Sequence, residues 1–130
     1  MELIDQVRER FRNDRFATGN GAVIDEISDG FAKCSLDIQR DHMNATGTVM
    51  GGAIFTLADF AFAVASNWQG TPHVSRTSQI TYLGVAKGNK LVAEAHRIKE
   101  GYSTCYYLVD VKDELGNQVA QVTSDGFTKR

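Results

Sequence analysis

The chain has 130 residues, a formal net charge of −2 and a 42% hydrophobic composition. This length predicts one domain over residues 1–130, and the charge excludes a polyanion-binding face, so neither nucleic acid nor an anionic membrane is an expected partner. Cys34 and Cys105 are too few for a disulfide scaffold. The first residues are charged, and no apolar stretch approaches the roughly 20 residues of a membrane span, so a cytoplasmic protein is expected.

The N-terminal part of the chain predicts a helix followed by a hairpin. Apolar residues recur with helical spacing between Leu3 and Phe11. From residue 22 the apolar positions alternate, and Asp29-Gly30 is a strong signal for a two-residue turn between antiparallel strands. Residues 39–50 contain Asn, Thr and Gly and are predicted to form a loop.

A long apolar helix is expected over residues 52–68. After Gly52 this segment contains neither Gly nor Pro, and it is dense in Ala and Leu. Between Ala53 and Ala65 only Thr56 and Asp59 are polar. A helix that is apolar nearly all round must be covered on most sides, because it cannot simply lie on a surface.

Four strands are expected to follow, at about 73–83, 90–99, 102–111 and 118–128. Segregated helices and hairpin-linked strands are typical of an α+β fold with a largely antiparallel sheet. One sheet that curves around the long helix would satisfy the all-round hydrophobicity of that helix. The predicted architecture is therefore a curved antiparallel sheet wrapped around one long central helix.

Asp59 is the outstanding candidate for chemistry. A carboxylate among Phe55, Leu57 and Phe60 is costly to desolvate unless it is paired, and burial would raise its pKa. Perturbed carboxylates of this kind are frequent in active sites. The spacing leaves an alternative equally open, in which Asp59 lies on the one solvent-exposed face of the helix or caps a nearby loop amide.

The pair Gly51-Gly52 precedes the long helix. Glycines at this point would let a ligand approach the free N–H groups of the first helical turn, which can bind an anion or a developing oxyanion. The alternative is a plain transition from loop to helix. The residues His42, His73 and His96 share no metal-ligand spacing, so no metal is expected.

Residues 42–67, HMNATGTVMGGAIFTLADFAFAVASN, resemble the phenylacetate-degradation (PaaI-like) type of hotdog-fold acyl-CoA thioesterase, in the 4-hydroxybenzoyl-CoA thioesterase superfamily. The signature of that family runs approximately H-x-N-x-x-G-x-x-H-G-G, four further residues, L-A-D, an Ala-rich helix and Asn. The matching positions here are His42, Asn44, Gly47, Gly51, Gly52, Leu57, Ala58, Asp59 and Asn67. The resemblance implies a hotdog fold, in which a curved sheet wraps the long helix.

The resemblance also implies hydrolysis of acyl-CoA thioesters to free acid and coenzyme A, at a site formed between two subunits. By this resemblance the N–H of Gly51 polarises the thioester carbonyl and Asn44 orients the substrate or the water. Asp59 of the opposite subunit acts as nucleophile or general base, roles that suit a carboxylate near a polarised carbonyl. A hydroxyl eighteen residues beyond the acid assists in some members, and that position is Thr77 here.

Two positions depart from the family pattern. Met50 stands where the family usually has His, and Gly84-Val85 stands where an Arg-Pro pair that serves the coenzyme A phosphates is common. Met50 and Gly52 are expected beside the bound substrate. The implied partners are an acyl-CoA and further copies of the chain, as a homodimer or a dimer of dimers, with no cofactor beyond the coenzyme A of the substrate.

Two other functions stay open at this point. A hotdog domain can bind acyl-CoA as a ligand sensor without hydrolysing it, although a retained Asp59 favours chemistry over binding alone. A hotdog dehydratase or hydratase couples His with Asp or Glu, and no His accompanies the helix acid here.

Overall fold

The computed structural model describes residues 1–129. The elements are α1 (Leu3–Phe11), α2 (Arg15–Gly19), β1 (Val23–Ser28), β2 (Phe31–Asp37), the 3₁₀ turn η1 (Arg40–His42), α3 (Gly51–Asn67), β3 (His73–Tyr82), β4 (Lys90–Glu100), β5 (Thr104–Asp113) and β6 (Gln118–Thr128). The first helix, the hairpin, the long helix and the four later strands are confirmed. The short helix α2 and the turn η1 were not predicted. Among the described residues, no helix has the length and apolar character to cross a membrane.

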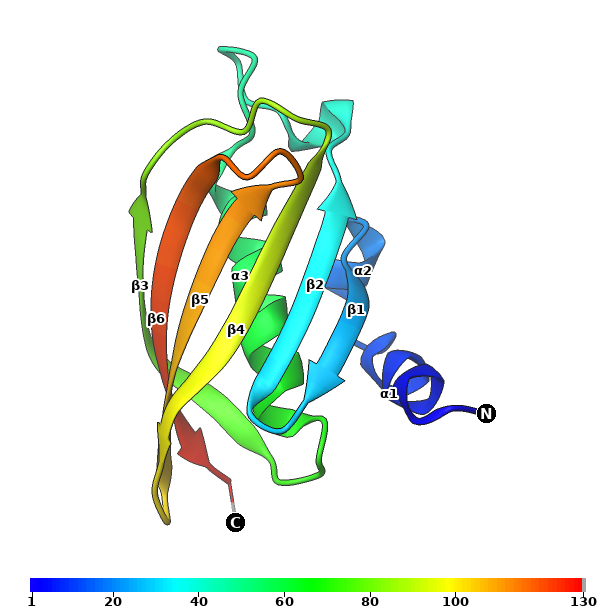
Figure 1. Cartoon of the computed structure of the whole chain (residues 1–130), viewed down its shortest axis with the longest axis vertical. Coiled ribbons are helices and arrows are strands. Elements are labelled where there is room, and N and C mark those ends of the chain that lie inside the picture. The colour runs from blue at the N-terminus through cyan, green and yellow to red at the C-terminus, as the bar shows by residue number, and fades with distance from the viewer. Residues whose placement is uncertain (130) are drawn as a thin grey trace.

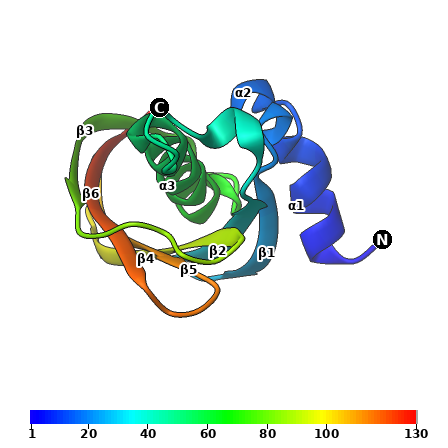
Figure 2. The same ribbon diagram turned by 90° about the horizontal axis from the view of Figure 1, so that it is seen from above.

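The strands form one sheet in the order β1-β2-β4-β5-β6-β3, and every neighbouring pair is antiparallel. The sheet curls around α3, which runs along its concave face (Figures 1 and 2). The edge strand β1 is flanked by α1 and α2, and Arg8 of α1 donates a hydrogen bond to the carbonyl of Ile24 at 2.9 Å. The opposite edge strand, β3, pairs only with β6 among the described residues. The predicted curved sheet around a central helix is confirmed.

The core lies between α3 and the concave face of the sheet. Leu57 and Val64 of α3 are completely buried, as is Val109 of β5. The ring of Phe62 meets that of Tyr107 edge-on, with centroids 5.4 Å apart. Because each fully buried side chain of this size contributes about 1.5–3 kcal/mol, the apolar character of α3 is the main force that fixes the helix in the sheet.

One stripe of α3 is not covered by the sheet. Its members recur every three or four residues and are exposed or half-buried: Gly52, Phe55, Thr56, Asp59 and Ala63. The expectation of a helix covered on most sides is confirmed, and this stripe is the side that the sheet leaves uncovered. The half-buried carboxylate of Asp59 lies in the middle of the stripe.

Both cysteines are buried in the core, Cys34 on β2 and Cys105 on β5. Burial raises the pKa of Cys105 to about 11, with a smaller contribution from Glu100. Burial also holds the pKa of Cys34 far above its ordinary value. Both thiols are therefore protonated near neutral pH.

Residues 83–89 connect β3 to β4 without regular structure, and a buried carboxylate holds them in place. Oδ2 of Asp113 accepts the N–H groups of Lys87 at 2.8 Å and Gly88 at 3.1 Å, while Oδ1 accepts the N–H of Asn117 at 2.8 Å. Burial alone would raise the pKa of Asp113, but these hydrogen bonds outweigh it and hold the pKa well below its ordinary value. The carboxylate thus ties this loop to the β5–β6 hairpin.

We expect Asp113→Asn to lower the melting temperature at pH 7, because the amide has one acceptor oxygen in place of two. The pKa of Asp113 is lower in the folded state than in the unfolded chain. The stabilisation by the ionised Asp113 carboxylate is therefore complete above the ordinary pKa of 3.8 and is lost as the pH falls below that value. The difference in Tm from the wild type should therefore shrink between pH 4 and pH 2, as measured by circular dichroism. Asp110→Asn, on the same strand, is the control and should change Tm little. A difference that does not depend on pH would contradict this account.

Candidate functional site

The N-terminus of α3 presents unpaired donors. Met50 precedes the helix in an extended conformation, and its side chain makes no capping hydrogen bond. The N–H of Ala53 reaches back to the Met50 carbonyl at 3.0 Å, but those of Gly51 and Gly52 have no acceptor within residues 1–129. The positive end of the helix dipole lies at the same place. These two N–H groups can therefore stabilise a negative oxygen.

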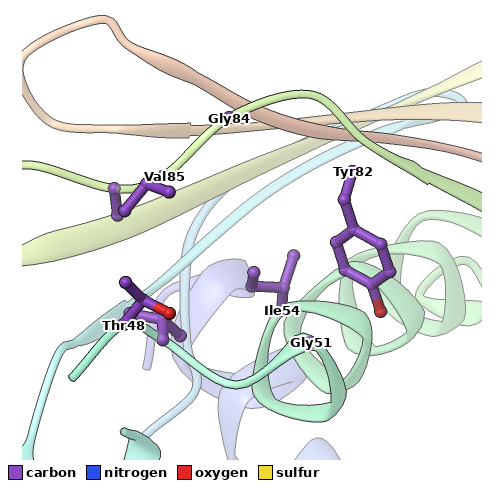
Figure 3. Close-up of a pocket in the computed structure, with 8 residues that line it drawn as sticks. Thr48, Gly51, Ile54, Tyr82, Gly84 and Val85 are labelled. Carbon is purple, nitrogen blue, oxygen red and sulfur yellow. The ribbon is translucent and has the colours of Figure 1, made fainter. Parts of the chain in front are cut away.

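A cavity of about 320 Å³ opens beside Gly51. In Figure 3 the hydroxyl of Tyr82 points toward Gly51, while Thr48 and Val85 lie on the other side of the cavity. A Cβ atom at Gly51 would lie 2.7 Å from the Tyr82 hydroxyl, so a larger residue at this position would displace the Tyr82 side chain. The residues that line the cavity are Thr48, Val49, Gly51, Ile54, Tyr82, Gly84, Val85 and Ala86. One wall is thus the loop that Asp113 holds.

Asn44 shapes the turn that leads to Gly51. Its Oδ1 accepts the N–H groups of Thr46 at 3.0 Å and Thr48 at 3.1 Å, and its Nδ2 donates to Oγ1 of Thr48 at 3.0 Å. The side chain of Asn44 is therefore engaged within its own loop. This is a role that the sequence analysis missed, and it leaves one Nδ2 hydrogen for another acceptor.

His42 is locked between two backbone groups. Its Nδ1 accepts the N–H of Gln39 at 2.9 Å, and its Nε2 lies 2.8 Å from the carbonyl of Asn20. Because a backbone N–H can only donate and a carbonyl can only accept, the ring is a neutral imidazole with its hydrogen on Nε2. His42 thus connects the loop before α3 to the end of α2 and has no nitrogen left for chemistry.

Asp59 lies in a different cavity, of about 350 Å³, between α2 and α3. Its carboxylate has no hydrogen-bond or ion-pair partner among residues 1–129, so the alternative in which it caps a loop amide is wrong. Burial raises the pKa of Asp59 above its ordinary value, and the negative charge of Asp14 raises it further. An unpaired carboxylate with a raised pKa is a stronger base than a solvated one.

Within one chain the expected site residues do not meet. Eight residues of helix separate Gly51 from Asp59, which corresponds to about 12 Å along the axis. Met50 and Gly52 line a third cavity of about 260 Å³, with Phe16 and Leu36 among its walls.

The remaining expected residue, Thr77, lies on β3, and its N–H donates to Asp125 at 3.1 Å. Among the described residues it lines none of these three cavities. Thr77 is exposed on this edge strand of the sheet.

Three features of these cavities lie outside residues 42–67, which carry the family signature. Tyr82 covers Gly51, the loop 83–89 forms a wall, and Asp14 faces the cavity of Asp59. The sequence analysis singled out Gly84-Val85 of that loop but missed Asp14, which precedes the unpredicted α2.

Comparisons with known proteins agree over most of the chain. Residues 15–125 match a family described as a domain of unknown function, DUF4442. A candidate esterase of Archaeoglobus fulgidus is 36% identical over 121 residues, which are 92% of this chain and 79% of that protein. Acyl-coenzyme A thioesterase PaaI of Escherichia coli is 32% identical over 112 residues, which are 85% of this chain and 79% of that protein.

Solved structures show the same fold. The structure of the E. coli PaaI protein superposes with a TM-score of 0.90 and 25% identity, over 99% of this chain and 97% of that one. A Streptococcus mutans protein bound to acetyl CoA has a TM-score of 0.77 and 26% identity, over 82% of this chain and 86% of that one. These matches confirm the hotdog fold that the resemblance implied. The chain belongs to the DUF4442 family and, within the hotdog fold, to the PaaI-like thioesterases.

Proposed function

We propose that this protein hydrolyses acyl-CoA thioesters to a free acid and coenzyme A. The observation that carries the proposal is the start of α3, where the N–H groups of Gly51 and Gly52 are unpaired among the described residues and Gly51 lines a cavity. In the proposed complex the carbonyl oxygen of the thioester accepts the N–H of Gly51. That N–H then stabilises the charge that develops on the oxygen as the carbonyl carbon is attacked.

Asp59 supplies the second half of the chemistry. As a general base, its carboxylate takes a proton from water, the hydroxyl adds to the carbonyl carbon, and the C–S bond breaks to release the thiolate of coenzyme A. As a nucleophile, it attacks the same carbon, releases the thiolate and forms an anhydride that water cleaves. Both routes need the ionised carboxylate, and its raised pKa increases its strength as a base.

A homodimer is the assembly that this chemistry requires. A carboxylate about 12 Å along the helix from Gly51 cannot reach a carbonyl bound at Gly51 of its own chain. The uncovered stripe of α3 and the free edge of β3 are surfaces that a second copy would cover in an isologous pairing. Such a pairing would bring Asp59 of one subunit to the Gly51 cavity of the other. Further pairing into a dimer of dimers stays a prediction.

We assign the remaining residues to substrate binding. Met50 is 54% exposed and, with Gly52, lines the cavity of about 260 Å³ on which Phe16 and Leu36 also lie. This cavity is largely apolar and suits the acyl group. The hydroxyl of Thr77, exposed on the edge strand β3, is the group that we expect to assist beside Asp59 once two subunits pair.

We expect Asp59→Asn to keep the fold and to lower kcat about 10²–10⁴-fold, the usual effect of losing a positioned base. The fold should survive because Asp59 has no partner among the described residues. Release of free thiol from a panel of acyl-CoA substrates measures turnover, and Asp110→Asn is the control with the same change of charge. Turnover within a few-fold of the wild type would refute the role of Asp59. Substrate binding without any thiol release by the wild type would favour the ligand sensor.

Two substitutions at Asn44 separate its role in the loop from a contact with the substrate. Asn44→Ala should speed hydrogen exchange at the Thr46 and Thr48 amides by about tenfold, the equivalent of one lost hydrogen bond. Asn44→Asp keeps the acceptor oxygen and should keep those amides protected, yet lose most turnover because it lacks the Nδ2 donor. An Asn44→Asp variant as active as the wild type would show that Asn44 acts on the loop alone.

Mixing two inactive variants tests whether the site spans two subunits. Asp59→Ala and Asn44→Ala are prepared separately and mixed under conditions that exchange subunits. Random pairing makes about half of the dimers mixed, and each mixed dimer has one intact site, so activity should recover to about a quarter of the wild type. Native mass spectrometry verifies the exchange. No recovery after verified exchange would show that both residues act within one subunit.

A further inference from the structure

The cavity that contains Asp59 holds a second carboxylate, that of Asp14. Asp14 and Asp59 line the same space of about 350 Å³, one from the residue before α2 and the other from α3. The family signature at residues 42–67 does not include Asp14. The cavity is lined by Asp14, Arg15, Phe16, Ala17, Phe55, Thr56, Asp59, Phe60 and Ala63.

The backbone of Asp14 is anchored while its side chain is not. Its N–H donates to the carbonyl of Phe11 at 3.0 Å, and its own carbonyl accepts both the N–H and the hydroxyl of Thr18 at 3.0 Å. An aspartate before a helix usually accepts an N–H of the first turn, but the side chain of Asp14 makes no such bond. Its carboxylate therefore keeps its charge available to the cavity.

The charged groups that face Asp59 are few. From α2 and the residue before it come Asp14 and Arg15, and the other described residues that line the cavity carry no charge. Asp59 is half-buried beside Phe55 and Phe60, so its carboxylate interacts with a neighbouring charge more strongly than it would in bulk solvent. After burial, the Asp14 charge is the cause that raises the pKa of Asp59, and burial raises that of Asp14 itself.

We propose that Asp14 is a positioning residue for Asp59, and that its carboxylate keeps Asp59 a strong base and sets the pH at which turnover begins. The inference rests on the proposed function, in which ionised Asp59 is the base or the nucleophile. Asp14 itself exchanges no proton with the substrate. It acts through its charge, which makes Asp59 hold its proton more tightly when protonated and accept one more readily when ionised.

The test compares the pH dependence of kcat/KM in the wild type, Asp14→Asn and Asp110→Asn. Asp14→Asn removes the charge but keeps a residue suited to a helix start, so Tm should change little. The acidic limb of its profile should move to lower pH. At a pH below the midpoint of the wild-type acidic limb, Asp14→Asn should keep a severalfold larger fraction of its own plateau kcat/KM than the wild type keeps of its plateau. Asp110→Asn removes one negative charge as well, but on the far side of the sheet, and should not move the acidic limb of the profile.

A direct titration of Asp59 distinguishes the failure of this inference from failure of the proposed function. The ¹³C resonance of the Asp59 carboxyl, assigned by its loss in Asp59→Asn, should titrate at lower pH in Asp14→Asn than in the wild type. If either the titration or the acidic limb does not move while Asp59→Asn is inactive, the role of Asp14 is refuted and the thioesterase stands. If Asp59→Asn remains fully active, the role of Asp59 fails and this inference fails with it, whereas a wild type that releases no thiol would overturn the proposed function itself.

Discussion

The burial of α3 against the concave face of the sheet is the constraint on which the rest of the molecule depends. A helix as apolar as α3 must be enclosed, and a six-stranded antiparallel sheet can enclose it only by curving. The enclosure fixes where the helix starts, and hence where its free N–H groups emerge beside Tyr82. It also fixes which stripe stays uncovered, and so places Asp59 at the surface between α2 and α3.

The walls of the site are irregular segments made rigid by polar side chains. The side chains of Asn44, His42 and Asp113 bind backbone groups of irregular segments, in the case of Asn44 those of its own loop. These bonds replace the ladder of a regular element, so the loops before α3 and after β3 keep a defined shape. Groups held in advance around a reacting carbonyl need no reorganisation during the reaction, which is the main source of electrostatic stabilisation in enzymes.

Much of the fold could be predicted because the helices, strands and turns of this chain have distinct local sequence patterns. The composition of residues 52–68 predicted a helix, and Asp29-Gly30 predicted the first hairpin. The short α2 could not be predicted, because five residues are too few to show an apolar period. Without α2 there was no reason to place Asp14 near Asp59.

The site was predictable in part. The glycines before α3 and the lone helix acid were found from residue types and spacing. The cavity beside Gly51 depends on Tyr82 and Val85, which lie more than thirty residues further along the chain. No local sequence pattern indicates that residues so far apart in the chain line the same cavity. The spacing also left two environments open for Asp59, because it could not show which side of α3 the sheet would leave uncovered.

The buried cysteines have a consequence for the redox behaviour of this protein. Thioester hydrolysis liberates a thiol, and an accessible protein thiolate can attack a disulfide of that thiol, forming a mixed disulfide and releasing the other sulfur as a thiolate. Cys34 and Cys105 lie inside the core and hold their protons near neutral pH, so neither offers a thiolate to such a disulfide. Burial in the folded core therefore protects both cysteines from forming mixed disulfides with the released product.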